Sequence, residues 1–290
     1  MLNQSQKEYL FRINKVLDFI EANLDKELTV KQLADAAAFS AFHFHRIFSF
    51  LVGEPLGAYV GRKRIEQAAR LLYQNPDLPI SEVAEKTGFN SMSVFCRNFK
   101  SRFGMSAAEF RANPDVVISK NRQLNSKFSQ PVADRVAYVC DIQTYKNGGF
   151  MLNQGIEIKE MPGLQLLYTR HVGDFHLIGQ AYGRLFQWAG ARGLLAQPNL
   201  KTVTVYHDDP GITEISKVRQ SACITISQDV EAEGEFGLMA LPKMQCVVGH
   251  FEIVPTDFQK AWDEVCAWLS KSGFQPADGY PYELYHNDHE

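Results

Sequence analysis

Apolar residues recur at helical spacing through the first 114 positions of the chain. One pattern occurs twice, with an amphipathic helix, a turn and a second helix: LTVKQLADAA then SAFHFHRIFSFLVG, and PISEVAEKTG then SMSVFCRNFKSRFG. Between the copies, VGRKRIEQAARLLYQN keeps the helical spacing and predicts a connecting helix. A further helix is predicted from Leu10 to Leu24. Residues 1–114 are therefore expected to form an all-helical domain with two helix-turn-helix motifs.

The two copies align with each other at an offset of 50 to 51 residues. The matched residues are Phe44, Arg46, Phe48 and Gly53 in the first copy and Phe95, Arg97, Phe99 and Gly104 in the second. Phenylalanines at this spacing are typical of a small helical core. In the second turn Gly88 suits a left-handed backbone, whereas the first turn has Ala38. Keeping that geometry at alanine would cost about 1 kcal/mol, so the first turn is open to a different conformation.

The rear of the chain contains a second duplication, at an offset of about 80 residues. In each copy a strand (LQLLYTRHV or MQCVVGHFEI) leads to an amphipathic helix and then to another strand (TVTVYHD or PYELYHN). Tyr182 and Trp188 of the first helix match Trp262 and Trp268 of the second. The segment VRQSACITISQ adds one more strand to the first copy only. Residues 155–290 are expected to form a duplicated strand-helix-strand-strand domain, which makes the fold class an all-helical domain followed by an α+β domain.

Residues 115–154 show no sustained periodicity, so they are expected to be an interdomain linker. The first rear copy ends with the extra strand in VRQSACITISQ. By analogy with that strand, the second copy stops about twenty residues early. Either its last strand is absent, which would leave a sheet edge open to pairing, or the sequence is a shortened form.

Composition and charge narrow the class of protein. Of 290 residues, 45% are hydrophobic and 22% charged, as in soluble globular domains. The five cysteines include no C-x-x-C pair and the N-terminus has no features of a leader segment, so we expect a cytoplasmic protein. No apolar run is long enough for a membrane span, so none is expected. Residues 1–114 carry a net charge of +3, residues 115–154 of +2 and residues 155–290 of −8. No nucleotide-binding, hydrolase or metal-binding motif occurs, so no catalytic residue, cofactor or metal is predicted.

The phrases LADAAAFSAFHFHRIFSFLVGEPLGAYVGRKRIEQAARLL and ISEVAEKTGFNSMSVFCRNFKSRFGMSAAEFR resemble the two-motif DNA-binding domain of the AraC/XylS family of transcription regulators. The resemblance implies double-stranded promoter DNA as the partner, with RNA polymerase as a second one. A recognition helix places its exposed residues at base edges in the major groove. These residues are Ala41, Phe42, His45 and Arg46 in the first motif and Met92, Ser93, Cys96 and Arg97 in the second. For Cys96, an ordinary contact and a redox sensor both stay open.

Residues 155–290 resemble the GyrI-like effector-binding domain. The residues that carry this resemblance are Gly173-Asp174-Phe175, the two tryptophan helices, VYHDDPG and Pro281-Tyr282-Glu283-Leu284-Tyr285. The resemblance implies a cleft that takes small, often cationic, aromatic or amphipathic molecules and is lined by Glu283. Strand alternation puts Glu283 and Tyr285 on one face, and Thr204 stands where the first copy would have Glu283. The other expected cleft residues are Tyr168, Tyr182, Trp188, Trp262, Trp268 and Tyr280, with a core position as the alternative for each tryptophan.

These expectations combine into a cytoplasmic transcription regulator that binds promoter DNA through its front half and a small-molecule effector through its rear half. Two alternatives stay open for the rear domain. It could hydrolyse a reactive small molecule with Glu283 as base or nucleophile and Tyr285 as donor, or it could sequester a protein partner.

Overall fold

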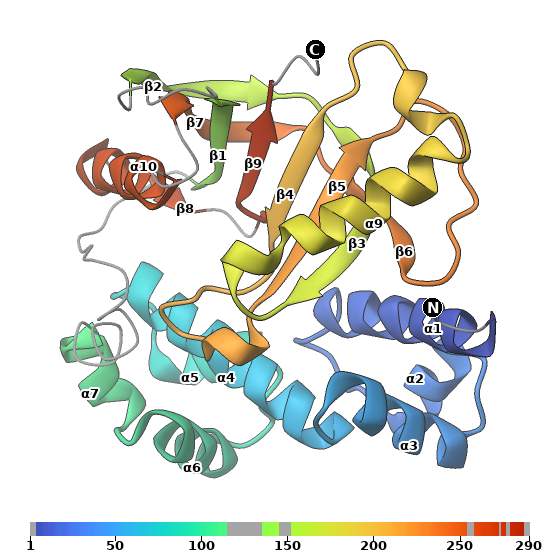
Figure 1. The fold of residues 1–290 in the computed structure, drawn as a ribbon. Helices are drawn as coiled ribbons and strands as arrows, with labels where there is room; N and C mark the ends of the chain where they lie inside the picture. Colours follow the sequence, from blue (N-terminus) through green and yellow to red (C-terminus); the bar gives the residue numbers. More distant parts are fainter. Residues whose placement is uncertain are drawn as a thin grey trace. The chain divides into compact units, whose positions relative to one another are not determined.

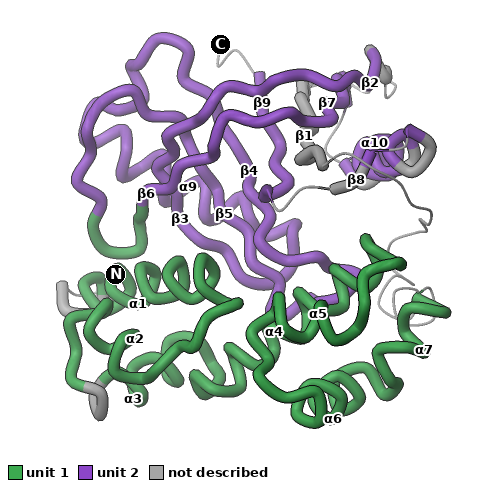
Figure 2. The backbone as a smooth tube through the Cα atoms, turned by 180° about the vertical axis from the view of Figure 1, so that it is seen from behind, with its two compact units in different colours: residues 1–120, 233–237 green, residues 121–232, 238–290 purple. Residues whose placement is uncertain are grey.

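The computed structural model describes residues 4–114, 135–144, 152–253, 258–272, 274–276 and 279–286 (Figure 1). The chain divides into two compact units (Figure 2). Unit 1 comprises residues 1–120 with 233–237, and unit 2 comprises residues 121–232 with 238–290. Residues 4–114 form helices joined by turns and the later described segments form a sheet with helices, so the predicted fold class is confirmed. Within the described ranges no helix is both long and apolar enough to cross a membrane.

Seven helices are described in unit 1, and they include both predicted motifs. Helices α2 and α3 form the first motif and α5 and α6 the second, with α4 as the connecting helix. Their bounds are α1 Gln4–Glu21, α2 Val30–Ala36, α3 Ala41–Val52, α4 Leu56–Gln74, α5 Ile80–Lys86, α6 Met92–Phe103 and α7 Ala107–Ala112. Phe44 and Phe48 pack beside Tyr59 of α4, and Phe99 packs against Phe110 of α7. The repeated phenylalanines Phe44, Phe48, Phe95 and Phe99 are completely buried, as their spacing predicts.

Both turns adopt the same left-handed geometry, although only one contains glycine. The φ angle is +52° at Ala38 and +78° at Gly88, and Phe39 and Phe89 donate equivalent backbone hydrogen bonds to Ala34 and Ala84. The first turn therefore keeps the geometry and carries the strain of an alanine at positive φ. Glycine is required in the second turn for another reason as well, because a Cβ at Gly88 would lie 2.3 Å from the carbonyl oxygen of Leu24.

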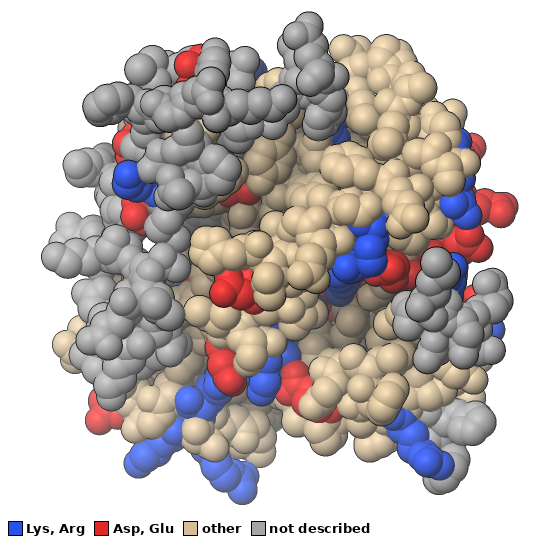
Figure 3. Space-filling view, in the orientation of Figure 1, with Lys and Arg blue, Asp and Glu red and all other residues tan. Residues whose placement is uncertain are grey.

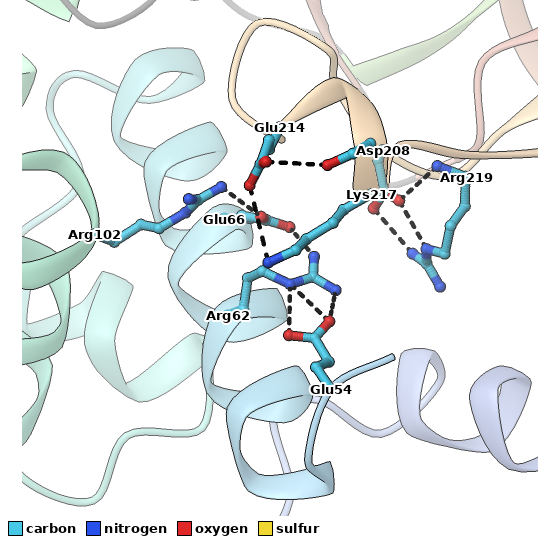
Figure 4. Close-up of polar contacts among 9 residues, drawn as sticks. Glu54, Arg62, Glu66, Arg102, Asp208, Glu214, Lys217 and Arg219 are labelled. Atoms are coloured by element: carbon cyan, nitrogen blue, oxygen red, sulfur yellow. Dashed lines mark hydrogen bonds and ion pairs between the residues drawn. The ribbon is translucent and has the colours of Figure 1, made fainter. Parts of the chain in front are cut away.

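A buried ion network fixes helix α4 within unit 1 (Figure 4). Arg62 donates to Glu54 at 2.5 Å and to Glu66 at 3.0 Å, and Arg102 of α6 reaches the other oxygen of Glu66 at 3.3 Å. Burial lowers the pKa of Arg62, but its hydrogen bond to Glu54 and the charges of the Glu66 and Glu54 carboxylates outweigh that effect and leave the pKa above its ordinary value. The network therefore ties the α3–α4 turn and α6 to α4 through charge-assisted hydrogen bonds.

Unit 2 is built on one curved sheet with strand order β2-β7-β1-β9-β4-β5-β3-β6, and β8 pairs with β1. The strands are β1 Arg135–Thr144, β2 Leu152–Met161, β3 Leu164–Val172, β4 Thr202–Tyr206, β5 Arg219–Thr225, β6 Phe236–Leu241, β7 Met244–Ile253, β8 Gln275–Pro276 and β9 Tyr282–Tyr285. Helix α9 (Gly179–Gly190) packs on β3 and β5, and α10 (Phe258–Ser272) packs on β7 and β1. Short 3₁₀ turns are η1 Phe175–Leu177, η2 Leu194–Ala196 and η3 Ile215–Lys217.

The predicted duplication is visible in the order of the strands. Strands β3 and β7, helices α9 and α10, and strands β4 and β9 are equivalent pairs, and β4 pairs with β9 in antiparallel fashion at the centre of the sheet. Thr204 lies directly opposite Glu283 in this ladder. The two matched positions therefore meet at the point where the two copies join.

The interpretation of residues 115–154 as a linker is wrong for residues 135–144. These residues form β1, which lies between β7 and β9 and pairs with both in parallel. In the other half of the sheet β5 takes the equivalent place between β3 and β4, with antiparallel pairing. Strand β1 thus fills the position for which the second copy has no strand of its own. Its partners lie more than a hundred residues away, so no local pattern marks their pairing.

Candidate functional site

The predicted DNA-reading residues lie on the outer faces of α3 and α6. His45, Arg46, Met92, Ser93, Cys96 and Arg97 are all exposed, and the phenylalanines between them are buried. This separation follows from the 3.6-residue period, which turns the matched arginines away from the matched phenylalanines. The side chains of Ala41 and Phe42 lie outside the described residues. In Figure 3 lysine and arginine side chains gather at the lower left, over α6, and one smaller blue patch lies at the lower right, near α3.

The connecting helix separates the two motifs by a length that suits DNA. Helix α4 has 19 residues, which corresponds to about 28 Å at 1.5 Å per residue. Adjacent major-groove segments on one face of B-DNA are about 34 Å apart. A connecting helix of this length is compatible with two recognition helices entering successive groove segments.

In unit 2, Glu283 is a buried carboxylate held by two side-chain donors. It lies on β9 and is 2% exposed. The indole Nε1 of Trp262 donates to Oε1 at 2.7 Å, and the hydroxyl of Tyr285 donates to Oε2 at 2.5 Å. Trp262 comes from α10, whereas Glu283 and Tyr285 share one face of β9 because they are two residues apart.

The same hydrogen-bond chain continues into the first copy of the duplication. The hydroxyl of Thr204 lies 3.1 Å from that of Tyr285 and 2.9 Å from that of Tyr182 on α9. Each member of the first copy has its counterpart in the second: Thr204 and Glu283, Tyr206 and Tyr285, Tyr182 and Trp262. The cluster is therefore pseudo-symmetric except for its single acidic residue.

Burial and hydrogen bonding act in opposite directions on this carboxylate. Burial raises the pKa of Glu283, the donors Tyr285, Trp262 and Tyr206 lower it, and the net pKa lies above the ordinary value. Burial, followed by the charge of Glu283, also raises the pKa of Tyr285 well above its usual range. The phenol therefore stays protonated and remains a donor. When ionised, Glu283 is a buried negative charge beside aromatic rings, an arrangement that is suited to an organic cation.

The other predicted cleft residues do not join this hydrogen-bond chain. Tyr168 packs with Val203 and Cys223 on the opposite face of the sheet from Glu283, so its assignment to the cleft is corrected. Trp188 lies under the guanidinium of Arg192, at 3.9 Å from the ring centre. Trp268 packs in the apolar cluster of α10 that also contains Trp262 and Tyr285. Tyr280 is exposed, and its ring contacts His207.

Sequence reasoning missed two members of the site, Thr204 and Tyr206. Tyr206 hydrogen-bonds to Glu283, and its ring lies 5.6 Å from that of Trp262 and 5.7 Å from that of Phe175. The signal was present in the duplication, because an offset of 79 relates Tyr206 to Tyr285 just as it relates Thr204 to Glu283. Antiparallel pairing of β4 with β9 turns that numerical relation into contact.

Comparison with known proteins supports the domain expected for each half of the chain. The model of a GyrI-like small molecule binding domain matches residues 154–290, and that of a helix-turn-helix domain matches residues 33–113. The chain is 34% identical to the HTH-type transcriptional activator AarP of Providencia stuartii, over 38% of this chain and 83% of AarP. It is 35% identical to the probable transcription factor PqrA of Proteus vulgaris, over 35% of this chain and 84% of PqrA.

Among solved structures, the DNA-binding domain of AdpA in complex with a target DNA is 29% identical, with a TM-score of 0.35. The match covers 37% of this chain and 95% of that chain. The front half of the chain is identified as a DNA-binding domain by its repeated motif, by its exposed recognition helices and by the relatives that the chain matches. The chain belongs to the AraC/XylS family of transcription regulators, and its rear half is a GyrI-like small molecule binding domain.

Proposed function

We propose that one chain reads two successive major-groove segments of a promoter, with α3 in one and α6 in the next. The readers are Ala41, Phe42, His45 and Arg46 on α3 and Met92, Ser93, Cys96 and Arg97 on α6. Exposure of the six described side chains supports this assignment. Arginine can bind guanine in bidentate fashion, and Met92 can contact a thymine methyl group. The domain responsible is residues 1–114.

The effector of unit 2 is a small aromatic or amphipathic cation that pairs with Glu283. The supporting observation is a carboxylate that is 2% exposed and surrounded by Trp262, Tyr285 and Tyr206. A buried carboxylate without a cationic partner is costly, and a bound cation supplies that partner. The aromatic rings add cation–π attraction in a site from which water is excluded. The responsible domain is residues 155–290 together with β1.

The rear domain acts by binding, without turnover, and its occupancy changes the DNA affinity or the transcriptional output of the front domain in the cytoplasm. RNA polymerase is the further partner at the promoter; AarP, a relative, is named as a transcriptional activator. Such coupling requires the ligand to favour one state of the whole chain over another.

The test uses the full-length chain. A duplex ligand is first selected from random DNA, and its affinity is then measured by fluorescence anisotropy with and without tetraphenylphosphonium. Binding of this cation is followed independently by tryptophan fluorescence, since Trp262 contacts Glu283. Glu283→Gln should abolish cation binding, whereas Glu160→Gln, an exposed glutamate on β2, should not.

Cation binding that leaves DNA affinity and transcription unchanged would contradict the coupling. Consumption of a reactive ester in a Glu283-dependent manner would instead favour the hydrolase alternative, for which the short Tyr285–Glu283 hydrogen bond is the specific observation. A heterocomplex that survives saturation with the cation would favour protein sequestration.

A further inference from the structure

Gln220 is a buried side chain on the same face of the sheet as Glu283. It is 1% exposed and lies on β5, where it pairs with Tyr206 of β4 and His171 of β3. Glu283 pairs with Thr204, and Thr204 pairs with Ala222. Because Ala222 and Gln220 are two residues apart on one strand, their side chains share the face that carries Glu283.

The amide of Gln220 has one hydrogen-bonding atom without a partner. Its Nε2 donates to the carbonyl oxygen of Gly173 at 3.5 Å. Its Oε1 is buried and has no hydrogen-bond partner among the residues that the structure describes. Exchanging the two amide atoms would direct Oε1 at the Gly173 carbonyl oxygen, where two acceptors repel each other, so hydrogen bonding favours the orientation with Nε2 at Gly173. This orientation leaves Oε1 as the buried acceptor that lacks a described partner.

Aromatic side chains connect this acceptor with the carboxylate. The Cα atoms of Gln220 and Glu283 are about 12 Å apart, because they lie two strands apart in the sheet and two residues apart along the strand direction. Tyr206 lies between them on the same face, hydrogen-bonds to Glu283 and contacts the rings of Trp262 and Phe175. An elongated aromatic molecule lying along Tyr206 would have one end at Glu283 and the other at Gln220.

We propose that Gln220 is a specificity-determining residue of the effector site, and that it selects aromatic cations whose far end carries a neutral N–H or O–H donor. This inference rests on the proposed cation site at Glu283. A neutral donor fits better than a second charge, because a cation buried beside an uncharged amide would lack a counter-ion. A donor-bearing ligand satisfies the orphan oxygen, whereas a ligand without a donor leaves it unpaired and loses affinity.

Two matched probes separate the two ends of the ligand. One is the 4′-hydroxybiphenyl-4-ylmethyl trimethylammonium cation, and the other is its 4′-methoxy analogue, which accepts but does not donate. Both are titrated calorimetrically into the full-length wild-type chain and into Gln220→Leu, Gln220→Asn and Glu283→Gln. We expect the wild type to bind the hydroxyl probe about tenfold more tightly than the methoxy probe. The ratio should fall to one in Gln220→Leu, and it should also decrease in Gln220→Asn, whose shorter side chain withdraws the uncharged amide from the ligand.

The outcomes distinguish the two proposals. Glu283→Gln should weaken both probes equally, since the ammonium group is common to them. Equal affinity of the wild type for both probes, or an unchanged ratio in Gln220→Leu, overturns the role of Gln220 alone. Failure of the wild type to bind either probe overturns the cation site and this inference with it. Thermal melting of each variant shows whether it is folded, and Gln220→Asn keeps the test valid if Gln220→Leu is not.

Discussion

At the scale of single residues, Glu283 links stability to pH. Its folded-state pKa is raised, so the folded protein holds a proton at pH values where the unfolded chain has lost it. Its contribution to the free energy of unfolding is therefore most favourable in acid and is lost as the pH rises through the folded-state pKa. Above that pKa the folded protein bears the cost of a buried charge.

Glu283→Gln should remove this dependence. Glutamine keeps the shape, accepts from Trp262 through Oε1 and does not ionise. The difference in melting temperature, variant minus wild type, should grow as the pH is raised above the ordinary glutamate value of 4.5. Thermal melting across the pH range, with Glu160→Gln as control, measures it. Parallel curves for Glu283→Gln and wild type would show that the Glu283 carboxyl group has the same pKa in the folded and the unfolded state.

The two turns of unit 1 offer a pair of substitutions with opposite expected signs. Gly88→Ala adds a methyl group 2.3 Å from the Leu24 carbonyl oxygen at φ +78°, so it should lower the free energy of unfolding by about 2 kcal/mol or more. Ala38→Gly relieves the strain at φ +52° and should raise it by up to about 1 kcal/mol. Urea titration of both variants measures the difference, and equal destabilisation would rule out strain in the first turn.

At the scale of elements, α3 and α6 occupy equivalent places in the repeat but need not contribute equally to DNA affinity. Arg46 and Arg97 occupy the same position of the repeat and are both exposed. The ion network of Arg62, Glu66 and Arg102 joins α6 to α4 and so orients the second motif within unit 1. A recognition helix held in this way loses little freedom on binding.

Arg97→Ala should weaken binding to the selected duplex by about 1 to 3 kcal/mol. If Arg97 contacts a base, the loss should be concentrated at one base pair; if it contacts a phosphate, all duplexes should weaken alike and the salt dependence should decrease. Anisotropy titrations at two salt concentrations separate these cases. Lys31→Ala, an exposed charge on α2, is the control, and equal losses for both variants would remove α6 from the interface.

At the scale of the whole molecule, the sheet of unit 2 depends on a strand outside the duplication. Strand β1 pairs with β9 over Val139–Tyr282 to Ile142–Tyr285, and β9 carries Glu283. The ligand site is thus built next to a strand that precedes the predicted domain. A fragment beginning at residue 155 would lack that strand.

Val139→Pro in the full-length chain should destabilise unit 2 and weaken cation binding. Proline cannot donate to the ladder and is poorly tolerated in a central strand, and β1 lies between β7 and β9. Val139→Ala keeps the backbone donor and is the matched control. Tryptophan fluorescence during urea unfolding measures stability, and titration with tetraphenylphosphonium measures binding. Wild-type behaviour of Val139→Pro would show that β1 is dispensable.

The front domain could be predicted almost completely, whereas the ligand site could be predicted only in part. The helices of both motifs, the glycine turn at Gly88 and the outward faces of α3 and α6 follow from residues three to ten positions apart, and local periodicity carries that information. The geometry of the first turn was left open by Ala38, and the structure shows that it is left-handed too. For the rear domain, the resemblance to GyrI-like domains indicated Glu283, and strand alternation and the duplication placed Tyr285, Tyr182 and Trp262 with it as expected cleft residues. Other features of the site depend on which strands pair. These are the place of Thr204 and Tyr206 in the hydrogen-bond chain, the position of Tyr168 on the other face, the strand β1 and the orphan oxygen of Gln220. Pairing joins residues far apart in the chain, so it was decided by packing and backbone hydrogen bonding in the folded sheet.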